Sequence, residues 1–265
     1  MKIRTETRNN RKVFYFFRIR VAIKLRPSIW RVLYYRIQQK FRTAKTVCYS
    51  CMCGDYNELE NHYYINPQWD YICFTDNQDL LKHKHRGIWR VMPLQSQQGD
   101  GTLNNRWHKF FPHKFLSNYE SSVYIDTNVN VLTDKLKRTL EQREETFLVP
   151  KHFRNDCIYK ELNSIVEDKK DTAEHMDVLR QLYEKEKMPH NLGCSENNVI
   201  YRKHSDMSLY PLMEQWWNML LRYSRRDQAS LVYVLWKNGK DINNYTFDNC
   251  RIDNLNFCVT DHKRK

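Results

Sequence analysis

The stretch around Asp126 constrains the fold of this chain more than any other. A short apolar run over residues 123–125 ends at Asp126, a spacer follows, and Asn128 begins a second apolar alternation. Side chains two residues apart on an extended chain project to the same side, so Asp126 and Asn128 offer two oxygen ligands together. A hard divalent cation such as Mg²⁺ or Mn²⁺ binds such oxygens and keeps water and substrate phosphate in its shell. The pattern predicts a strand that ends at a metal site, and a strand followed by a plain Asn/Asp turn is the other interpretation.

Apolar runs typical of strands alternate with segments of helical spacing from residue 46 onward. This alternation indicates a mostly parallel α/β sheet flanked by helices, so residues 46–265 are expected to form one catalytic domain. Open sheets of this kind bind ligands beyond the carboxyl ends of their strands. The strands are expected at 46–51, 71–74, 88–92, 122–125, 146–149 and 199–201. The helices are expected at 105–118 and near 156–167, 172–187, 208–222 and 226–237.

The positive charge of the chain is concentrated in residues 1–45. The whole chain has 44 Lys and Arg residues against 31 Asp and Glu residues, a formal net charge of +13. Residues 1–45 contain 14 of these basic residues and one acid, Glu6, so their net charge is 14 − 1 = +13 and the remainder is neutral. This segment is therefore expected to be a basic arm with an electrostatic role of its own.

The basic arm, residues 1–45, is expected to form two short amphipathic helices separated at Pro27 and Ser28. Basic helices with aromatic apolar faces suit an anionic membrane surface, so the protein is expected in the cytoplasm, peripheral on the inner face of the membrane. Packing of both helices on the catalytic domain is the alternative. Nucleic acid is not expected as a partner, because no nucleic-acid-binding module is recognisable. The apolar residues recur at Phe14, Phe17, Val21 and Leu25, and again at Trp30, Leu33, Ile37 and Phe41.

Cys48 and Cys51 form a Cys-x-x-Cys pair, a spacing found in zinc and redox sites. Their odd separation on a predicted strand points the two side chains to opposite faces. No second pair of matching spacing completes a zinc site. The eight cysteines are therefore expected to be free thiols, mostly buried, in a reducing compartment.

Three further motifs accompany the Tyr124–Asn128 segment in a fixed order: Lys-x-x-Pro-His-Lys over 109–114, Asn-x-Gly over 191–193, and Arg-Asp-Gln over 226–228. In this order they resemble the bacterial and plant proteins of the mucilage-related glycosyltransferase-like family, once filed as a domain of unknown function. More distantly they resemble the glycogenin-like retaining enzymes. The resemblance runs from about Thr46 to the carboxyl end and implies a GT-A-like nucleotide-diphospho-sugar transferase fold. Asn128 departs from the glycogenin-like pattern, which has a second Asp there.

The resemblance also implies an activity. A sugar would be transferred from a nucleotide-sugar donor, a UDP-sugar, to a cell-surface glycan or a lipid-linked saccharide acceptor, with a divalent metal and retention of configuration. Two alternatives remain. One is a lipid amide hydrolase acting on ceramide-type substrates, although neither a Ser nucleophile elbow nor a His-Glu-x-x-His motif is present. The other is a non-catalytic, membrane-bound scaffold.

Individual residues receive expected roles from these arguments. Alternatives are a turn for Tyr56, Thr75 and Asp76, a solvated helix face for Arg106 and Lys109, a polar tail for His262 and a helix cap for Asp227. The metal ligands are expected to be Asp126, Asn128 and His262. The donor nucleotide, diphosphate and sugar are expected to meet Tyr56, Thr75, Asp76, Arg106, Lys109, Asn191 and Gly193. The catalytic residues are expected to be Lys109, Asp227 and Gln228.

Overall fold

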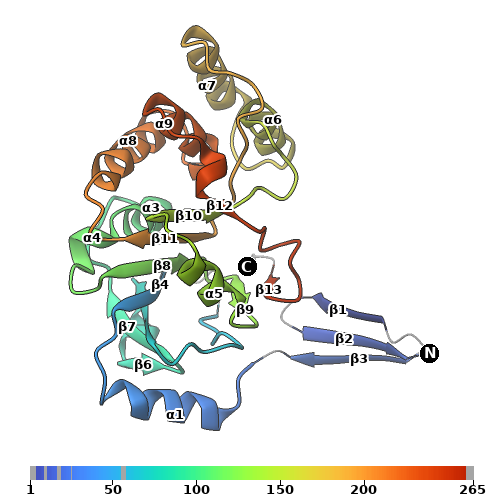
Figure 1. The fold of residues 1–265 in the computed structure, drawn as a ribbon, viewed down its shortest axis with the longest axis vertical. Coiled ribbons are helices and arrows are strands. Elements are labelled where there is room, and N and C mark those ends of the chain that lie inside the picture. The colour runs from blue at the N-terminus through green and yellow to red at the C-terminus, as the bar shows by residue number, and fades with distance from the viewer. Residues whose placement is uncertain (1–3, 9–10, 17–18, 25, 55–57, 261–265) are drawn as a thin grey trace.

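The structure is a computed structural model that describes residues 4–8, 11–16, 19–24, 26–54 and 58–260. An eight-stranded mixed sheet forms the centre of the protein (Figure 1). Its strands are β4 (Thr46–Met52), β5 (Trp69–Thr75), β6 (His85–Arg86), β7 (Trp89–Pro93), β8 (Ser121–Ile125), β10 (Phe147–Pro150), β11 (Val199–Lys203) and β12 (Thr246–Phe247). They lie in the order β12-β10-β11-β8-β4-β5-β7-β6. The central strands β8, β4, β5 and β7 are parallel, whereas β11 is antiparallel to both of its neighbours.

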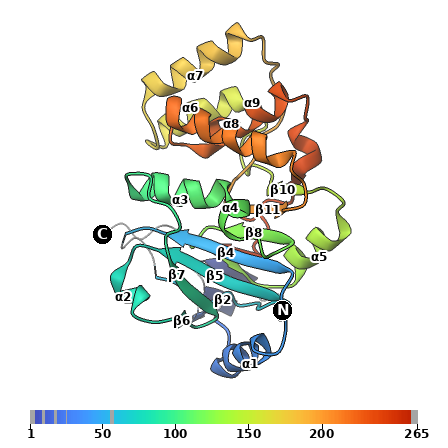
Figure 2. The ribbon, with the colours of Figure 1, turned by 90° about the vertical axis from the view of Figure 1, so that its left-hand side faces the viewer.

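Helices cover both faces of this sheet (Figure 2). The first face packs against a layer of helices, and α7 (Ala173–Lys185) lies outside this layer against α6 (Figure 2). The layer contains α3 (Gly101–Phe110), α4 (Pro112–Phe115), α6 (Ile158–Glu167), α8 (Leu209–Arg222) and α9 (Leu231–Lys237). The second face packs against α1 (Ile29–Gln39), α2 (Gln78–Leu81), α5 (Lys135–Gln142) and the strand pair β9 (Val129–Val131) and β13 (Phe257–Val259). Two 3₁₀ turns, η1 (Asp227–Ala229) and η2 (Ile242–Tyr245), flank α9.

The alternation of side chains along β4 confirms the expected orientation of the two cysteines. Cys51 belongs to the apolar core on the α3 face, and Cys48 belongs to the core on the opposite face. Both are buried, and the chain has only free thiols. The two cysteines of the Cys-x-x-Cys pair therefore fill the apolar cores on opposite faces of β4, a strand buried on both faces as is usual in parallel sheets.

The predicted alternation of strands and helices is confirmed in the described residues from 46 onward, with differences where caps and a proline intervene. The helix expected over 105–118 begins earlier, because the Asp100 side chain accepts the Leu103 backbone N–H at 3.0 Å and caps it. It is interrupted at Phe111, which has φ −117° and ψ 44°, because Pro112 follows. The helix expected near 226–237 is the turn η1 followed by α9.

The basic arm is only partly helical. Three strands, β1 (Arg4–Arg8), β2 (Arg11–Phe16) and β3 (Ile19–Lys24), form an antiparallel sheet, so the helix predicted around Phe14–Leu25 is wrong for the residues that the structure describes. In residues 19–24 the large apolar residues Ile19, Val21 and Ile23 alternate with Arg20, Ala22 and Lys24. This period of two is typical of a strand, and a strand is what this segment forms. The second helix is confirmed as α1, capped by Ser28. Within the described residues, no helix is long and apolar enough to span a membrane.

His62 is a buried histidine that the fold holds neutral. Its Nδ1 accepts the Val131 backbone N–H at 3.4 Å, and burial lowers its pKa to about 4. An unfolded histidine, with a pKa near about 6.5, binds a proton that folded His62 lacks. The free energy of unfolding should therefore fall as the pH drops from about 6.5 to about 4, with His62 contributing about 3 kcal/mol at the acid end.

A His62→Gln variant tests this pH dependence, because glutamine does not titrate. Urea unfolding of both proteins between about pH 7 and about pH 4 should show a flatter loss of stability in the variant. The same slope in both proteins would mean that His62 does not carry the predicted share.

Candidate active site

A cluster of charged side chains lies at the carboxyl ends of the parallel strands. Asp126 follows β8, and its backbone N–H donates to the Asn198 carbonyl at 2.8 Å, just before β11. Helix α3 crosses the same edge and brings Arg106 and Lys109 there, while η1 adds Asp227. The structure thus places four of the sequence-predicted site residues at the edge where open α/β sheets bind ligands.

Asp227 forms an ion pair with Lys109 in the interior. The Lys109 Nζ lies 2.6 Å from Asp227 Oδ2, and an Arg106 Nη2 lies 3.3 Å from Asp227 Oδ1. The Lys109 and Asp227 side chains are only 2% and 3% exposed. Removing both charges from water costs much of the free energy that their attraction supplies, so this ion pair need not stabilise the fold. Buried charge pairs of this kind are common in functional sites. The solvated-face alternative for Arg106 is wrong, because its side chain is 15% exposed and paired.

Hydrogen bonds connect this ion pair to Asp126. An Arg106 Nη1 donates to Asn105 Oδ1 at 2.9 Å, and Asn105 Nδ2 donates to the Tyr124 hydroxyl at 3.1 Å. Tyr124 in turn donates to Asp126 Oδ1 at 2.7 Å. We call Asn105, Arg106, Lys109, Tyr124, Asp126 and Asp227 the acid–base network. The network fixes both carboxylates relative to the cations of α3.

The charges of the network keep Asp227 ionised. Burial by itself would raise the pKa of this carboxyl, but the positive charges of Arg106, Lys109 and Arg226 outweigh burial and hold the pKa well below its usual range. The pKa of Arg106 is correspondingly raised, because Asp227 and Asp126 outweigh its desolvation. Asp227 is thus a fixed negative charge and a weak base at neutral pH.

Asp227 is not the helix cap that the sequence allowed as an alternative. Arg226 occupies the capping position of η1, and no side chain caps that turn. The Asp227 carboxylate points instead to Lys109 and Arg106. Gln228 is half-buried beside it, and its amide oxygen accepts an Arg226 Nη2 at 2.9 Å.

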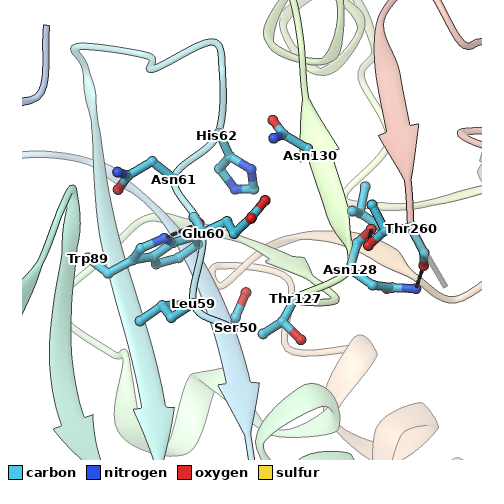
Figure 3. Close-up of a pocket in the computed structure, with 11 residues that line it drawn as sticks. Ser50, Leu59, Glu60, Asn61, His62, Trp89, Thr127, Asn128, Asn130 and Thr260 are labelled. Atoms are coloured by element: carbon cyan, nitrogen blue, oxygen red, sulfur yellow. Dashed lines mark hydrogen bonds between the residues drawn. The ribbon is translucent and has the colours of Figure 1, made fainter. Parts of the chain in front are cut away.

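Asn128 lies next to the last described residue of the chain. Its Nδ2 donates to the Thr260 carbonyl at 2.8 Å, and the Thr260 backbone N–H donates to the Asn128 carbonyl at 2.9 Å (Figure 3). The backbone at residues 126–128 makes the turn of the other interpretation, because the Val129 backbone N–H donates to the Asp126 carbonyl at 2.9 Å, so a shared metal role for the two side chains stays a prediction. His262 lies outside the described residues, and among those described no group of three or more His, Cys, Asp or Glu side chains could hold a metal.

Thr75 and Asp76 make the side-chain to backbone hydrogen bonds that are expected of turn residues. The Thr75 hydroxyl accepts the Asn77 backbone N–H at 3.1 Å, and Asp76 Oδ1 accepts the Gly54 backbone N–H at 2.8 Å. Asp76 therefore joins the ends of β4 and β5. Tyr56 lies outside the described residues, and nucleotide binding by these three side chains stays a prediction.

Asn191 and Gly193 lie in an irregular segment before β11. Both have positive φ, 59° and 99°, and a Cβ on Gly193 would come within 3.0 Å of Ile242 and Asn243. The close approach expected at this glycine is thus made by η2 of the same chain. Among the described residues, no hydrogen bond or ion pair joins this segment to Asp126 or Asp227, so its role toward the sugar stays a prediction.

Glu196 is a buried acid that the sequence reasoning left without a role. It is ion-paired with the Arg251 Nε, and Asn249 Nδ2 donates to its Oε2 at 3.0 Å. Because β11 is antiparallel, its first residues lie at the edge where β8 ends, whereas the sequence argument considered only residues after strands. The signal was the polar run 195–198 directly before an apolar strand. Tyr124 and Asn105 were missed for a simpler reason, since each resembles ordinary core or helix surface.

A comparison with protein families matches residues 37–262 to the TOD1/MUCI70 glycosyltransferase-like domain. The chain belongs to this family. The match confirms the predicted resemblance to this glycosyltransferase-like family, and the mostly parallel sheet flanked by helices fits the GT-A-like α/β fold that the resemblance implied. A search of curated proteins finds no match.

Two solved structures of glycosyltransferases are similar to the chain at low identity. The apo structure of the bifunctional glycosyltransferase WbbM is 12% identical, with a TM-score of 0.44, over 77% of this chain and 38% of that chain. The apo form of mouse xyloside xylosyltransferase 1 is 8% identical, with a TM-score of 0.41, over 74% of this chain and 82% of that chain. The chain thus spans well under half the length of WbbM.

Proposed function

We propose that this protein transfers a sugar from a UDP-sugar to a glycan or lipid-linked saccharide, with a divalent cation held by Asp126 and Asn128. The observation that carries the proposal is the acid–base network, which joins the Asp126 carboxylate to two cations and a second, buried carboxylate. In such a transfer, a carboxylate holds the metal and cations stabilise the departing diphosphate. A second carboxylate can stabilise the positive charge that develops on the sugar. Retention of configuration and action on the cytoplasmic side of a membrane remain predictions.

The residues at the end of β8 fit a hard divalent cation. Asp126 is half-buried rather than enclosed, and the amide oxygen of Asn128 is the atom of that side chain that could bind a cation, because its nitrogen donates to Thr260. His262 follows Thr260 by two residues, so its place in the sequence supports it as a third ligand. The bound cation, Mn²⁺ or Mg²⁺, would neutralise the charge that develops on the departing diphosphate.

Arg106 and Lys109 would add positive charge on the diphosphate side of the site. Asp227 would accept hydrogen bonds from sugar hydroxyls, with Gln228 beside it, and would favour positive charge at the anomeric carbon. A general base works best when its pKa lies near the working pH, and Asp227 is far below it. This supports an electrostatic role for Asp227 and therefore a retaining reaction. Tyr56, Thr75 and Asp76 are proposed for the nucleotide, and Asn191 and Gly193 for the sugar and acceptor.

A screen of nucleotide sugars tests the proposed function. With Mn²⁺ present, we expect release of UDP from at least one UDP-sugar, none from the Asp126→Ala variant, and less from donors with other bases. Family membership favours this activity over the two alternatives. Hydrolysis of a ceramide-type amide without any nucleotide release would favour the hydrolase, and neither reaction would favour the scaffold.

The Asn128→Asp variant should bind Mn²⁺ at least as tightly as the natural protein, by up to about tenfold, because a carboxylate is the stronger hard ligand. The new side chain cannot donate to the Thr260 carbonyl, so the melting temperature should fall slightly. Manganese affinity can be followed by electron paramagnetic resonance of the free ion. Lower metal affinity together with lower stability would show that Asn128 serves only to anchor Thr260.

A further inference from the structure

The outward face of helix α1 is apolar. Tyr35 and Val32 face the core, and the Tyr35 hydroxyl donates to the Trp69 carbonyl at 2.9 Å. On the opposite side Trp30 and Phe41 are 76% and 83% exposed, which is far beyond what a packed aromatic residue would show. We call the exposed set the α1 stripe: Ile29, Trp30, Leu33, Tyr34, Ile37 and Phe41.

The α1 stripe is continuous along the helix. At about 100° per residue its members fall within roughly 140° of the helix circumference, and Val32 and Tyr35 fall on the other side. The residues predicted from helical spacing, Trp30, Leu33, Ile37 and Phe41, thus face outward and do not pack on the catalytic domain. A contiguous exposed apolar surface of this kind marks an interaction site.

Basic residues border the α1 stripe without any acid among them. Residues 26–41 contain Arg26, Arg31, Arg36 and Lys40 and no Asp or Glu. In the part of the chain that the structure describes, no carboxylate forms an ion pair with any of the four. By helical spacing Arg31 lies along one border of the stripe, and Arg36 and Lys40 lie along the other.

We propose that the α1 stripe docks on an anionic lipid bilayer, with α1 lying in the headgroup region. Exposed Trp and Tyr together with flanking Arg and Lys suit this depth, where apolar side chains reach the acyl boundary and cations meet lipid phosphates. A second copy of the chain is a poor occupant, because the four basic residues beside the stripe of one copy would face the same four basic residues of the other. Most of the stripe precedes residue 37, where the family match begins, so it is a feature beyond the proposed transfer reaction.

The position of α1 allows this contact without blocking the acid–base network. α1 lies at the end of the molecule opposite α7 (Figure 1), on the far side of the sheet from α3 (Figure 2). The helix is tied to the sheet by Tyr35 and by Gln39, whose Nε2 donates to Asp70 Oδ1 at 3.2 Å. Docking would therefore orient the whole catalytic domain on the bilayer.

Co-sedimentation of the full chain with vesicles tests the proposal. The protein should sediment with phosphatidylcholine vesicles that contain one third phosphatidylserine, and binding should fall with added salt. A Trp30→Ser, Phe41→Ser double variant should lose about tenfold or more of its partitioning. The matched control, Met207→Ser with Leu221→Ser, removes side chains that are 71% and 53% exposed elsewhere and should bind like the natural protein.

Three outcomes would overturn the proposal. Equal partitioning of the natural protein and the stripe variant, or no binding to anionic vesicles at low salt, would remove lipid as the occupant. Sedimentation velocity without lipid supplies the third: a dimer that the stripe variant loses would assign the stripe to a second copy. Melting temperatures should be alike for all three proteins, because the substituted side chains are exposed.

Discussion

The Asp227→Asn variant should turn over at least about a hundredfold more slowly than the natural protein, a rise of about 2.7 kcal/mol or more in the activation barrier. The reason is that the fixed negative charge beside the donor sugar is lost, while the proposed metal and diphosphate contacts remain. UDP affinity should therefore barely change. Turnover and UDP binding measured on the same protein preparation check both statements.

The same substitution should also lower stability, and this needs a control. A neutral amide in place of the Asp227 carboxylate would leave the buried Lys109 without its ion-pair partner, a change that costs about 3–5 kcal/mol at buried pairs. Trp216→Phe offers the match, because the Trp216 Nε1 donates to the Asp227 backbone carbonyl at 2.9 Å and does not touch the carboxylate. If turnover of both variants simply follows their folded fractions, Asp227 is a structural residue and the catalytic assignment is wrong.

The stereochemical outcome is a second check on Asp227. An inverting reaction would require a general base, and Asp227 would then have to titrate in the pH–rate profile. The low pKa that Arg106, Lys109 and Arg226 impose against burial predicts that no Asp227 limb appears near neutral pH. Inversion with such a limb would contradict the electrostatic role.

The Asp126→Ala variant should lose Mn²⁺-dependent UDP binding and keep its fold. Asp126 is half-buried, and its Oδ1 accepts a hydrogen bond from Tyr124, which also accepts one from Asn105. Stability should therefore fall less than in Asp227→Asn. Calorimetric titration with UDP and Mn²⁺ measures the expected loss.

Asp70→Ala is the matched control for Asp126→Ala. Asp70 is also partly buried and hydrogen-bonded, to Arg42 and to the Tyr119 hydroxyl, but it lies near the amino-terminal end of β5, at the other edge of the sheet. This variant should bind UDP like the natural protein. Unchanged metal-dependent binding in Asp126→Ala would remove Asp126 from the site.

The sequence determines the elements of the catalytic domain well, because their signals are local. The apolar run before Asp126 and the capped start of α3 depend on residues close in sequence. Residues 19–24 fit a period of two as well as helical spacing, and the sequence alone does not decide between them. The partners of Asp227 lie on α3, far away along the chain, so only the fold shows that Lys109 neutralises it. Glu196 was unassigned because its strand runs against its neighbours.

A crystal structure with UDP and Mn²⁺ bound, located by the anomalous scattering of manganese, tests the central claim most directly. We expect one manganese peak in contact with Asp126 and Asn128, and a diphosphate that faces Arg106 and Lys109 across that ion. UDP and manganese bound at another edge of the sheet, or UDP bound with no manganese beside Asp126, would contradict it.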